Sequence, residues 1–279
     1  DERPTDTTPE LVDTLNSPAR IASGPGYDVL VVRWPALEGV FAEGLLLQPH
    51  KRGPLSLVLV GDAHHTPEEL AGLVESDDPA AQSIAKEVQK LAASGCRILI
   101  PTLINRESEF SLVAGRATGL SHREFIYRQA YEMGRHLIGY EVEKILAAVD
   151  WFHSDRLPSE YQFVGVYGFG EGGMLALYAG AVDERVNGVG VGGYFASRET
   201  IWQEPIDRNL FGLLAEFGDA AGPVDLVEHF PVDHHHGVCL RCLVGQGVVA
   251  PEEAGRAPGG EPGQAGPGDL DPGGERLQR

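Results

Sequence analysis

The sequence predicts an α/β fold: a mostly parallel sheet with a leading antiparallel hairpin and flanking helices. Two observations predict it. Short apolar runs alternate with segments of helical period from about residue 55 to residue 193. Two further apolar runs stand next to each other before that alternation starts, which is typical of a hairpin.

The hairpin is predicted over residues 28–34 and 40–47. Both runs are rich in residues that favour strands, and the turn between them carries Pro35 and Gly39. Residues 55–60 follow as a continuous apolar run that ends in Gly-Asp, which is typical of a strand buried on both faces.

A helix is predicted at about 79–94, where apolar residues recur at helical spacing. Residues 97–104 are predicted as another buried strand. The longest regular segment is 122–152, whose apolar period predicts one long helix with a buried face. Ser121 is its predicted N-cap, and Glu124 three residues later completes a capping box.

The next segment begins with a strand predicted over 163–168 and a helix over 171–182. A strand over 185–193 and a short helix over 208–220 follow. Ten of the 36 glycines fall within residues 165–193. Their interleaving with Val, Tyr, Leu and Ala indicates strands and tight turns.

Three segments of different kind are predicted. Residues 1–26 are polar and rich in Pro, Thr and Gly, and are expected to form a loose lead-in. Residues 27–220 are the α/β domain. Residues 221–279 are irregular and Gly/Pro-rich, and are expected to be disordered because they hold few large apolar residues to offset the entropy of ordering. A truncation or a reading-frame shift near residue 220 would also produce such a tail.

The composition argues against several classes of protein. The chain has 22 basic and 41 acidic side chains and a net charge of −19, which argues against a nucleic-acid partner. No apolar run approaches the roughly 18 residues that span a bilayer, so a soluble protein without a membrane partner is expected. The first residues are charged and contain neither a signal peptide nor an initiator Met, which leaves the compartment unassigned and export in a bacterium open.

The strand–glycine–helix junction carries the most chemical information. Gly168, Gly170 and Gly172 match the frame of a nucleophile elbow, G-x-S-x-G, with glycine in place of the nucleophilic serine. Gly168, Gly170 and Gly173 also match the dinucleotide fingerprint G-x-G-x-x-G, although the next strand ends without the acidic residue that binds the ribose. A tight strand-to-helix turn without chemistry is the third interpretation.

Residues 122–152, 168–186 and 193–220 together resemble a bacterial, planctomycete-type branch of the α/β-hydrolase superfamily. That branch is similar to dienelactone hydrolases and acetyl xylan esterases and carries GxGEGG where other hydrolases have GxSxG. The resemblance covers about residues 28–220. It implies an α/β-hydrolase-type fold, descent from carboxylic-ester hydrolases, a small-molecule ester, sugar or carboxylate as ligand, and no cofactor.

The candidate catalytic residues stand at the carboxyl ends of the predicted strands, where the cleft of such a sheet forms. Asp62 and His64 follow the strand at 55–60, and Glu171 follows the elbow glycine. A carboxylate and an imidazole there would serve as a general acid/base pair. The simpler interpretation is that Asp62 and His64 cap the next helix or lie in solvent.

Further side chains are expected to line the same cleft. His65, Arg106 and Tyr194 are the candidates for ligand binding, because each follows the end of a predicted strand. No triad acid or triad histidine can be assigned after residue 220. Three functions therefore remain open: an esterase-like enzyme with a non-standard constellation, a non-catalytic descendant that binds a carbohydrate or small acid, and a nucleotide-binding protein.

A cluster near the C-terminus has the chemistry of metal ligands. Cys239 and Cys242 form a C-x-x-C, and His234 and His236 precede it, so that four nitrogen and sulfur donors stand close together. The two pairs are closer in sequence than in the usual zinc finger. An accident of composition in the tail explains the cluster more simply, and no metal is expected.

Overall fold

The computed structural model describes residues 3–14, 18–113, 116–155, 162–194 and 202–213. All of them belong to the first of the two units into which the chain divides, Asp1–Gly245. The predicted tail at 221–279 lies outside the described residues.

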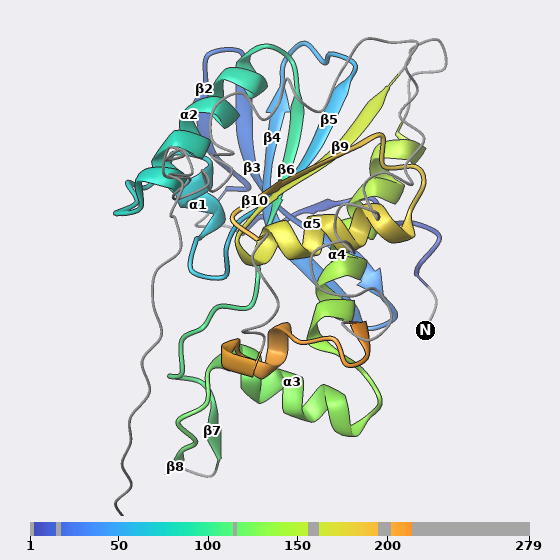
Figure 1. The fold of residues 1–279 in the computed structure, drawn as a ribbon. Coiled ribbons are helices and arrows are strands. Elements are labelled where there is room, and N and C mark those ends of the chain that lie inside the picture. Colours follow the sequence, from blue (N-terminus) through green and yellow to red (C-terminus); the bar gives the residue numbers. More distant parts are fainter. Residues whose placement is uncertain (1–2, 15–17, 114–115, 156–161, 195–201, 214–279) are drawn as a thin grey trace, which may run out of the picture. The chain divides into compact units, whose positions relative to one another are not determined.

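Eight strands form one mixed sheet (Figure 1). Its order is β1-β3-β4-β6-β5-β9-β10, and β2 also pairs with β3. Neighbours among β6, β5, β9 and β10 are parallel, whereas β1 to β4 pair antiparallel, as does β4 with β6. The strands are β1 (Glu10–Leu11), β2 (Arg20–Gly24), β3 (Tyr27–Leu37), β4 (Val40–Pro49), β5 (Leu55–Val60), β6 (Arg97–Pro101), β9 (Phe163–Phe169) and β10 (Gly188–Gly192). The predicted α/β class and the leading hairpin, β3 and β4, are confirmed.

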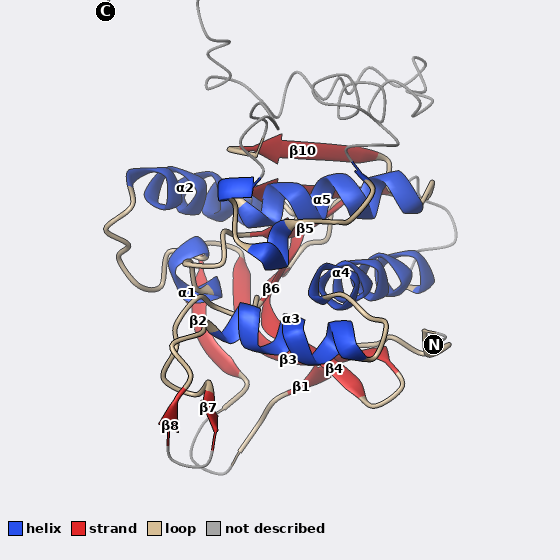
Figure 2. Cartoon of the chain, turned by 60° about the horizontal axis from the view of Figure 1, so that its bottom comes forward, coloured by secondary structure: helices blue, strands red, loops and turns tan. Residues whose placement is uncertain are grey.

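Helices cover both faces of the sheet (Figure 2). Apolar residues of α1 and α2 pack on one face, and those of α4 and α5 pack on the other. On the α4 side, Trp34 of β3 is fully buried, and its indole N–H donates to the carbonyl of Lys144 at 3.0 Å. The helices are α1 (Pro67–Leu70), α2 (Pro79–Ala93), α3 (His122–Glu132), α4 (Leu137–Ser154), α5 (Glu171–Val182) and the short 3₁₀ helix η2 (Ile206–Arg208); a two-stranded sheet, β7 (Leu112–Val113) and β8 (Arg116–Ala117), lies before α3.

The expected loose lead-in at residues 1–26 contains two strands, β1 and β2, both paired with β3. The difference arises at Pro25 and Gly26, which the sequence presents as breakers. They form a two-residue turn between β2 and β3, and Gly26 supplies the positive φ of 86° that the turn needs.

The segment 122–152, predicted as one helix, is two helices, α3 and α4. Ser121 caps α3 as predicted, with its side chain accepting the N–H of Glu124 at 3.2 Å. The break comes at Gly134, whose φ is 70°, where the N–H of Arg135 bonds back to the carbonyl of Ala130 at 2.8 Å. This is the glycine-terminated end of an α-helix. The apolar period continues across the break and hides it.

Other predicted elements are confirmed with small changes at their ends. The strand expected at 97–104 stops at Pro101, and the strand expected at 185–193 covers Gly188–Gly192. The helix expected at 208–220 is not seen in residues 209–212, which follow η2 as a loop and turn, and residues 214–220 lie outside the described residues. Among the described helices, none combines the length and apolar character that a membrane span requires.

The break between α3 and α4 predicts opposite effects for two glycines five residues apart. Gly134→Ala is expected to lower the free energy of unfolding by about 1 kcal/mol, because a Cβ disfavours the left-handed conformation. Gly139→Ala, inside α4 and in open space, is expected to raise it by about 0.5 kcal/mol. Urea denaturation of both variants measures the pair. Equal signs would contradict the break.

Candidate functional site at the strand–glycine–helix junction

The junction between β9 and α5 is a strained turn centred on Gly170. Its φ and ψ are 59° and −119°, and its N–H donates to the carbonyl of Gly192 at 2.9 Å. This backbone conformation is one that residues with a Cβ rarely adopt. The geometry is that of an elbow, and α5 starts immediately after it at Glu171.

The neighbouring glycines let α5 pack directly on the sheet. A Cβ at Gly168 would overlap the backbone of Gly172, and one at Gly172 would overlap the carbonyl of Val60. A Cβ at Gly173 would lie 2.7 Å from the carbonyl oxygen of Gly192. Close backbone packing therefore accounts for these glycines without a bound ligand.

The side chain of Asp62, which follows β5, fills the space in front of the elbow. Its Oδ2 accepts the N–H of Glu171 at 2.9 Å, and its Oδ1 accepts the N–H of His64 at 3.2 Å. A Cβ at Gly170 would overlap Oδ2 of Asp62. The carboxylate is thus held at the N-terminus of α5, where the helix dipole favours an anion.

Asp62 therefore receives backbone N–H groups from two separate segments of the chain. Glu171 at the start of α5 supplies one, and His64 in the loop after β5 supplies the other. The same carboxylate occupies the space into which a side chain at position 170 would project.

Glu171, the second candidate catalytic residue, is buried among three guanidinium groups. Its Oε2 lies 2.8 Å from Nη2 of Arg106 and 3.0 Å from Nε of Arg208, and its Oε1 lies 3.0 Å from Nη2 of Arg123. Burial raises the pKa of the Glu171 carboxyl, and the three guanidinium groups oppose that effect. Both of its oxygens are engaged in ion pairs.

The guanidinium group of Arg123 is the centre of this arrangement. Its side chain is fully buried and forms a two-pronged pair with Glu141 at 2.8 and 2.7 Å. Its Nε donates to Asp207 at 3.1 Å, and Nη1 donates to the carbonyl of Ile104 at 2.9 Å. The carboxylates raise the pKa of Arg123, so the group is a permanent cation.

We call this set of residues the elbow ion cluster; its members are Arg106, Arg123, Glu141, Glu171, Asp207 and Arg208. Three cations face three carboxylates, so the buried charges balance. The members come from the loop after β6, from α3, α4 and the start of α5, and from η2. The cluster therefore joins five segments that are distant in the sequence.

The remaining predicted site residues, which are His64, His65 and Tyr194, are not members of the elbow ion cluster. His64 is exposed, and its bond to Asp62 runs through the backbone N–H. His65 turns toward α2, with Nε2 3.0 Å from Asp78, the N-cap of that helix. Tyr194 lies beside α5, where its hydroxyl is 3.3 Å from that of Tyr178.

The structure brings together Asp62, Glu171 and Arg106 among the predicted residues. Four members of the elbow ion cluster are not among the residues predicted from the sequence: Arg123, Glu141, Asp207 and Arg208. One signal was available for Glu141, because a charged residue interrupts the apolar face of the helix at that point. The predicted cysteine and histidine ligands at 234–242 lie outside the described residues, and no cluster of metal-ligand type occurs among those that are described.

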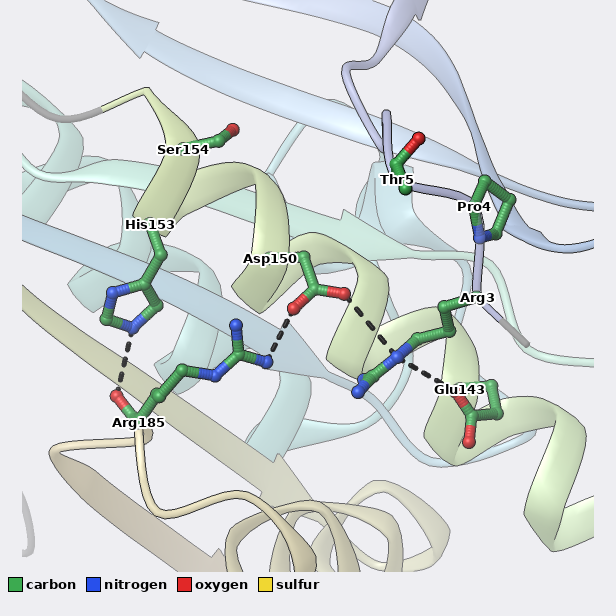
Figure 3. Close-up of a pocket in the computed structure, with 8 residues that line it drawn as sticks. All are labelled: Arg3, Pro4, Thr5, Glu143, Asp150, His153, Ser154 and Arg185. Atoms are coloured by element: carbon green, nitrogen blue, oxygen red, sulfur yellow. Dashed lines mark hydrogen bonds and ion pairs between the residues drawn. The ribbon is translucent and has the colours of Figure 1, made fainter.

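A separate polar hollow of about 700 Å³ lies near the C-terminal end of α4 (Figure 3). Asp150 pairs with Arg185 at 2.5 Å and with Arg3 at 3.4 Å, and Arg3 also contacts Glu143 at 3.4 Å. His153 contacts the carbonyl oxygen of Arg185 at 3.0 Å. These charged groups pair with one another. Arg185 precedes β10, so the hollow lies near the amino ends of the parallel strands, whereas the elbow lies at their carboxyl ends.

No family model and no curated protein sequence matches the chain. Solved structures similar to it include a Bacteroides fragilis protein assigned to the acetyl xylan esterases (TM-score 0.48, 15% identity), an acetyl xylan esterase from Paenibacillus sp. R4 (0.40, 16%) and a glucuronoyl esterase from Solibacter usitatus (0.43, 15%). The alignments cover 67%, 67% and 81% of this chain. They cover 48%, 53% and 62% of those chains, so this chain spans about half to three fifths of their length.

The contact between Asp62 and the elbow predicts a coupled effect of two substitutions. Gly170→Ser is expected to lower the free energy of unfolding by about 2–4 kcal/mol, from backbone strain and from overlap with Asp62. In an Asp62→Gly background the overlap is absent, so the cost is expected to fall by at least about 1 kcal/mol. Gly119→Ser, with a φ of 71° in open space, is the control and should show no such coupling. Additive costs at Gly170 would contradict the contact.

The elbow ion cluster predicts a large cost for removing one buried charge. Glu141→Gln is expected to cost about 3–5 kcal/mol, because it leaves the buried cation of Arg123 short of a carboxylate. For a domain of this size the melting temperature should fall by about 6–20 °C. Glu87→Gln, which breaks the exposed pair with Lys90, is the matched control and should cost about 0.5 kcal/mol or less. A similar loss in both variants would refute the balance of buried charges.

Proposed function

We propose that the described domain is a non-hydrolytic descendant of α/β-hydrolase esterases that binds a small hydroxylated ligand, such as a sugar, in front of its elbow. The observation that carries the proposal is the position of Asp62. Its carboxylate accepts the two N–H groups of Glu171 and His64 and stands where a side chain at position 170 would project.

Acyl transfer by the serine route needs a nucleophile and donors for the oxyanion that develops. Gly170 supplies no nucleophile. The two donors are already bonded to a negative group, so an oxyanion would have to displace Asp62 and would meet its charge. The elbow therefore lacks both the nucleophile and the free oxyanion donors that ester cleavage by the serine route requires.

Glu171 is also a poor general acid or base in this arrangement. Proton transfer needs a lone pair or proton within reach of the substrate. Both carboxylate oxygens of Glu171 are paired with buried or half-buried guanidinium groups, and the residue is 1% exposed. Glu171 thus fixes the start of α5 to its surroundings.

The carboxylate of Asp62 in front of the elbow favours a ligand that carries hydroxyl groups. Asp62 is half-buried and keeps acceptor capacity beyond its two backbone bonds, which suits O–H donors. Phe169, which precedes the elbow glycine, and Tyr194 are half-buried aromatic residues at the carboxyl ends of β9 and β10. A carboxylate ligand or a nucleotide phosphate would meet the charge of Asp62, so a neutral ligand is preferred over either.

One alternative function has an observation of its own. Because Asp62 stands at the place of the missing nucleophile, it would be the attacking or proton-accepting group of an ester hydrolase with a non-standard site. The experiment therefore measures turnover and binding on the same samples.

The proposal predicts ligand stabilisation without turnover. p-Nitrophenyl acetate should be hydrolysed no faster than in buffer, and xylose or glucose should raise the melting temperature by about 3–5 °C at ten times the dissociation constant. Asp62→Asn should abolish this shift, because it removes the charged acceptor. Asp78→Asn, the same change at the N-cap of α2, is the control and should keep it.

Two outcomes overturn the proposal. Turnover above buffer that falls at least tenfold in Asp62→Asn would assign the alternative, an ester hydrolase that uses Asp62. A thermal shift with acetate, NAD or ATP in place of the sugars would assign an anionic ligand instead.

A further inference from the structure

Residues 202–213, here called the strap, fasten to the rest of the domain beside the elbow. The strap contains η2 and lies next to α3 (orange in Figure 1). Arg208 pairs with Glu171 at 3.0 Å, and Asp207 pairs with Arg123 at 3.1 Å. These ion pairs hold the strap against the start of α5 and against α3.

A third attachment is made by His136, the N-cap of α4. Its Nδ1 accepts the N–H of Ile138 at 3.1 Å, and its Nε2 lies 3.2 Å from the carbonyl oxygen of Asn209 in the strap. Accepting at Nδ1 and donating at Nε2 is possible only for the neutral ring with its proton on Nε2. The tautomer is therefore set by its two partners.

Protonation of His136 is incompatible with this arrangement. A proton on Nδ1 would face the N–H of Ile138, and the cation would stand at the positive end of the α4 dipole. The ring would have to turn away, and the bond to Asn209 depends on its present orientation.

The groups around His136 oppose one another. The hydrogen bond to the carbonyl of Asn209, Asp207 of η2 and Glu141 of α4 favour the cation, whereas Arg123 of α3 disfavours it. The ring of Tyr127 packs edge-on at 4.9 Å. Burial is the largest effect and lowers the pKa of His136 below its ordinary value.

We propose that neutral His136 is a latch that holds the strap beside the elbow, and that protonation of His136 releases this end of the strap at mildly acidic pH. This regulatory role goes beyond the proposed ligand binding. The proposal does not depend on whether a sugar binds at Asp62. The latch would make access to the elbow ion cluster depend on pH.

The direction of the pH dependence follows from linkage. Because the fastened state has the lower pKa, the released state binds more protons as the pH falls. The latch contributes fully above about pH 6.5, the ordinary value for histidine, and is lost as the pH falls through the lowered pKa of the fastened ring.

Hydrogen exchange of peptides from the strap tests the latch. After correction for the intrinsic pH dependence of exchange, the protection of residues 206–213 should fall about fivefold or more between pH 7.5 and pH 5.5, the loss expected from one hydrogen bond. A peptide that covers β5 should keep its protection over the same range and serves as the internal reference for global stability.

Two variants separate the latch from the nearby carboxylates. His136→Asn keeps a good N-cap but cannot titrate, so the protection of its strap should not change with pH. His153→Asn is the matched control, because His153 also contacts a backbone carbonyl through Nε2, and it should keep the wild-type response.

Three results overturn the proposal. An equal fall in His136→Asn would place the titration on carboxylates such as Glu171, and an equal fall in the β5 peptide would show global loosening. Constant protection of the strap in the wild-type protein would overturn the latch even if His136→Asn failed to fold.

Discussion

The arrangement of the region around the elbow depends on one fully buried guanidinium group, that of Arg123. An unpaired cation there would be strongly destabilising, so carboxylates must come to it from wherever the chain can supply them. Glu141 comes from α4, Glu171 from α5 and Asp207 from η2. These ion pairs join two helices and the strap to one buried charge, in addition to the apolar packing that places α4 and α5 on the sheet.

Much of the sheet could be predicted because buried strands leave an apolar signature in the sequence itself. The runs at 55–60 and 163–168 became neighbouring parallel strands, β5 and β9. The divided helix could not be predicted in the same way. The apolar face of α3 continues into that of α4, and only the backbone at Gly134 distinguishes a turn from a further helical turn. The apolar period of a sequence indicates which side chains are buried. It does not indicate a bend in the backbone when the same side chains stay buried on both sides of the bend.

The site was predictable to the extent that strand ends converge. The rule that polar side chains after parallel strands share a cleft placed Asp62 near the elbow, and the structure has the two in contact. The rule does not say what they do there. Arg123 and Asp207 are separated by 84 positions, and their pairing follows from how the chain closes around the buried cation, which no pattern in the sequence encodes.

The contact between Gly170 and Asp62 also constrains how this sequence can evolve. A mutation that places serine at position 170 meets the carboxylate of Asp62, which has to move before the new side chain fits. Loss of Asp62 removes the overlap but leaves the N–H of Glu171 without its partner. Each single step toward a serine nucleophile passes through a less stable protein. The elbow therefore opposes a side chain at position 170 through the neighbouring Asp62 as well as through its own backbone conformation.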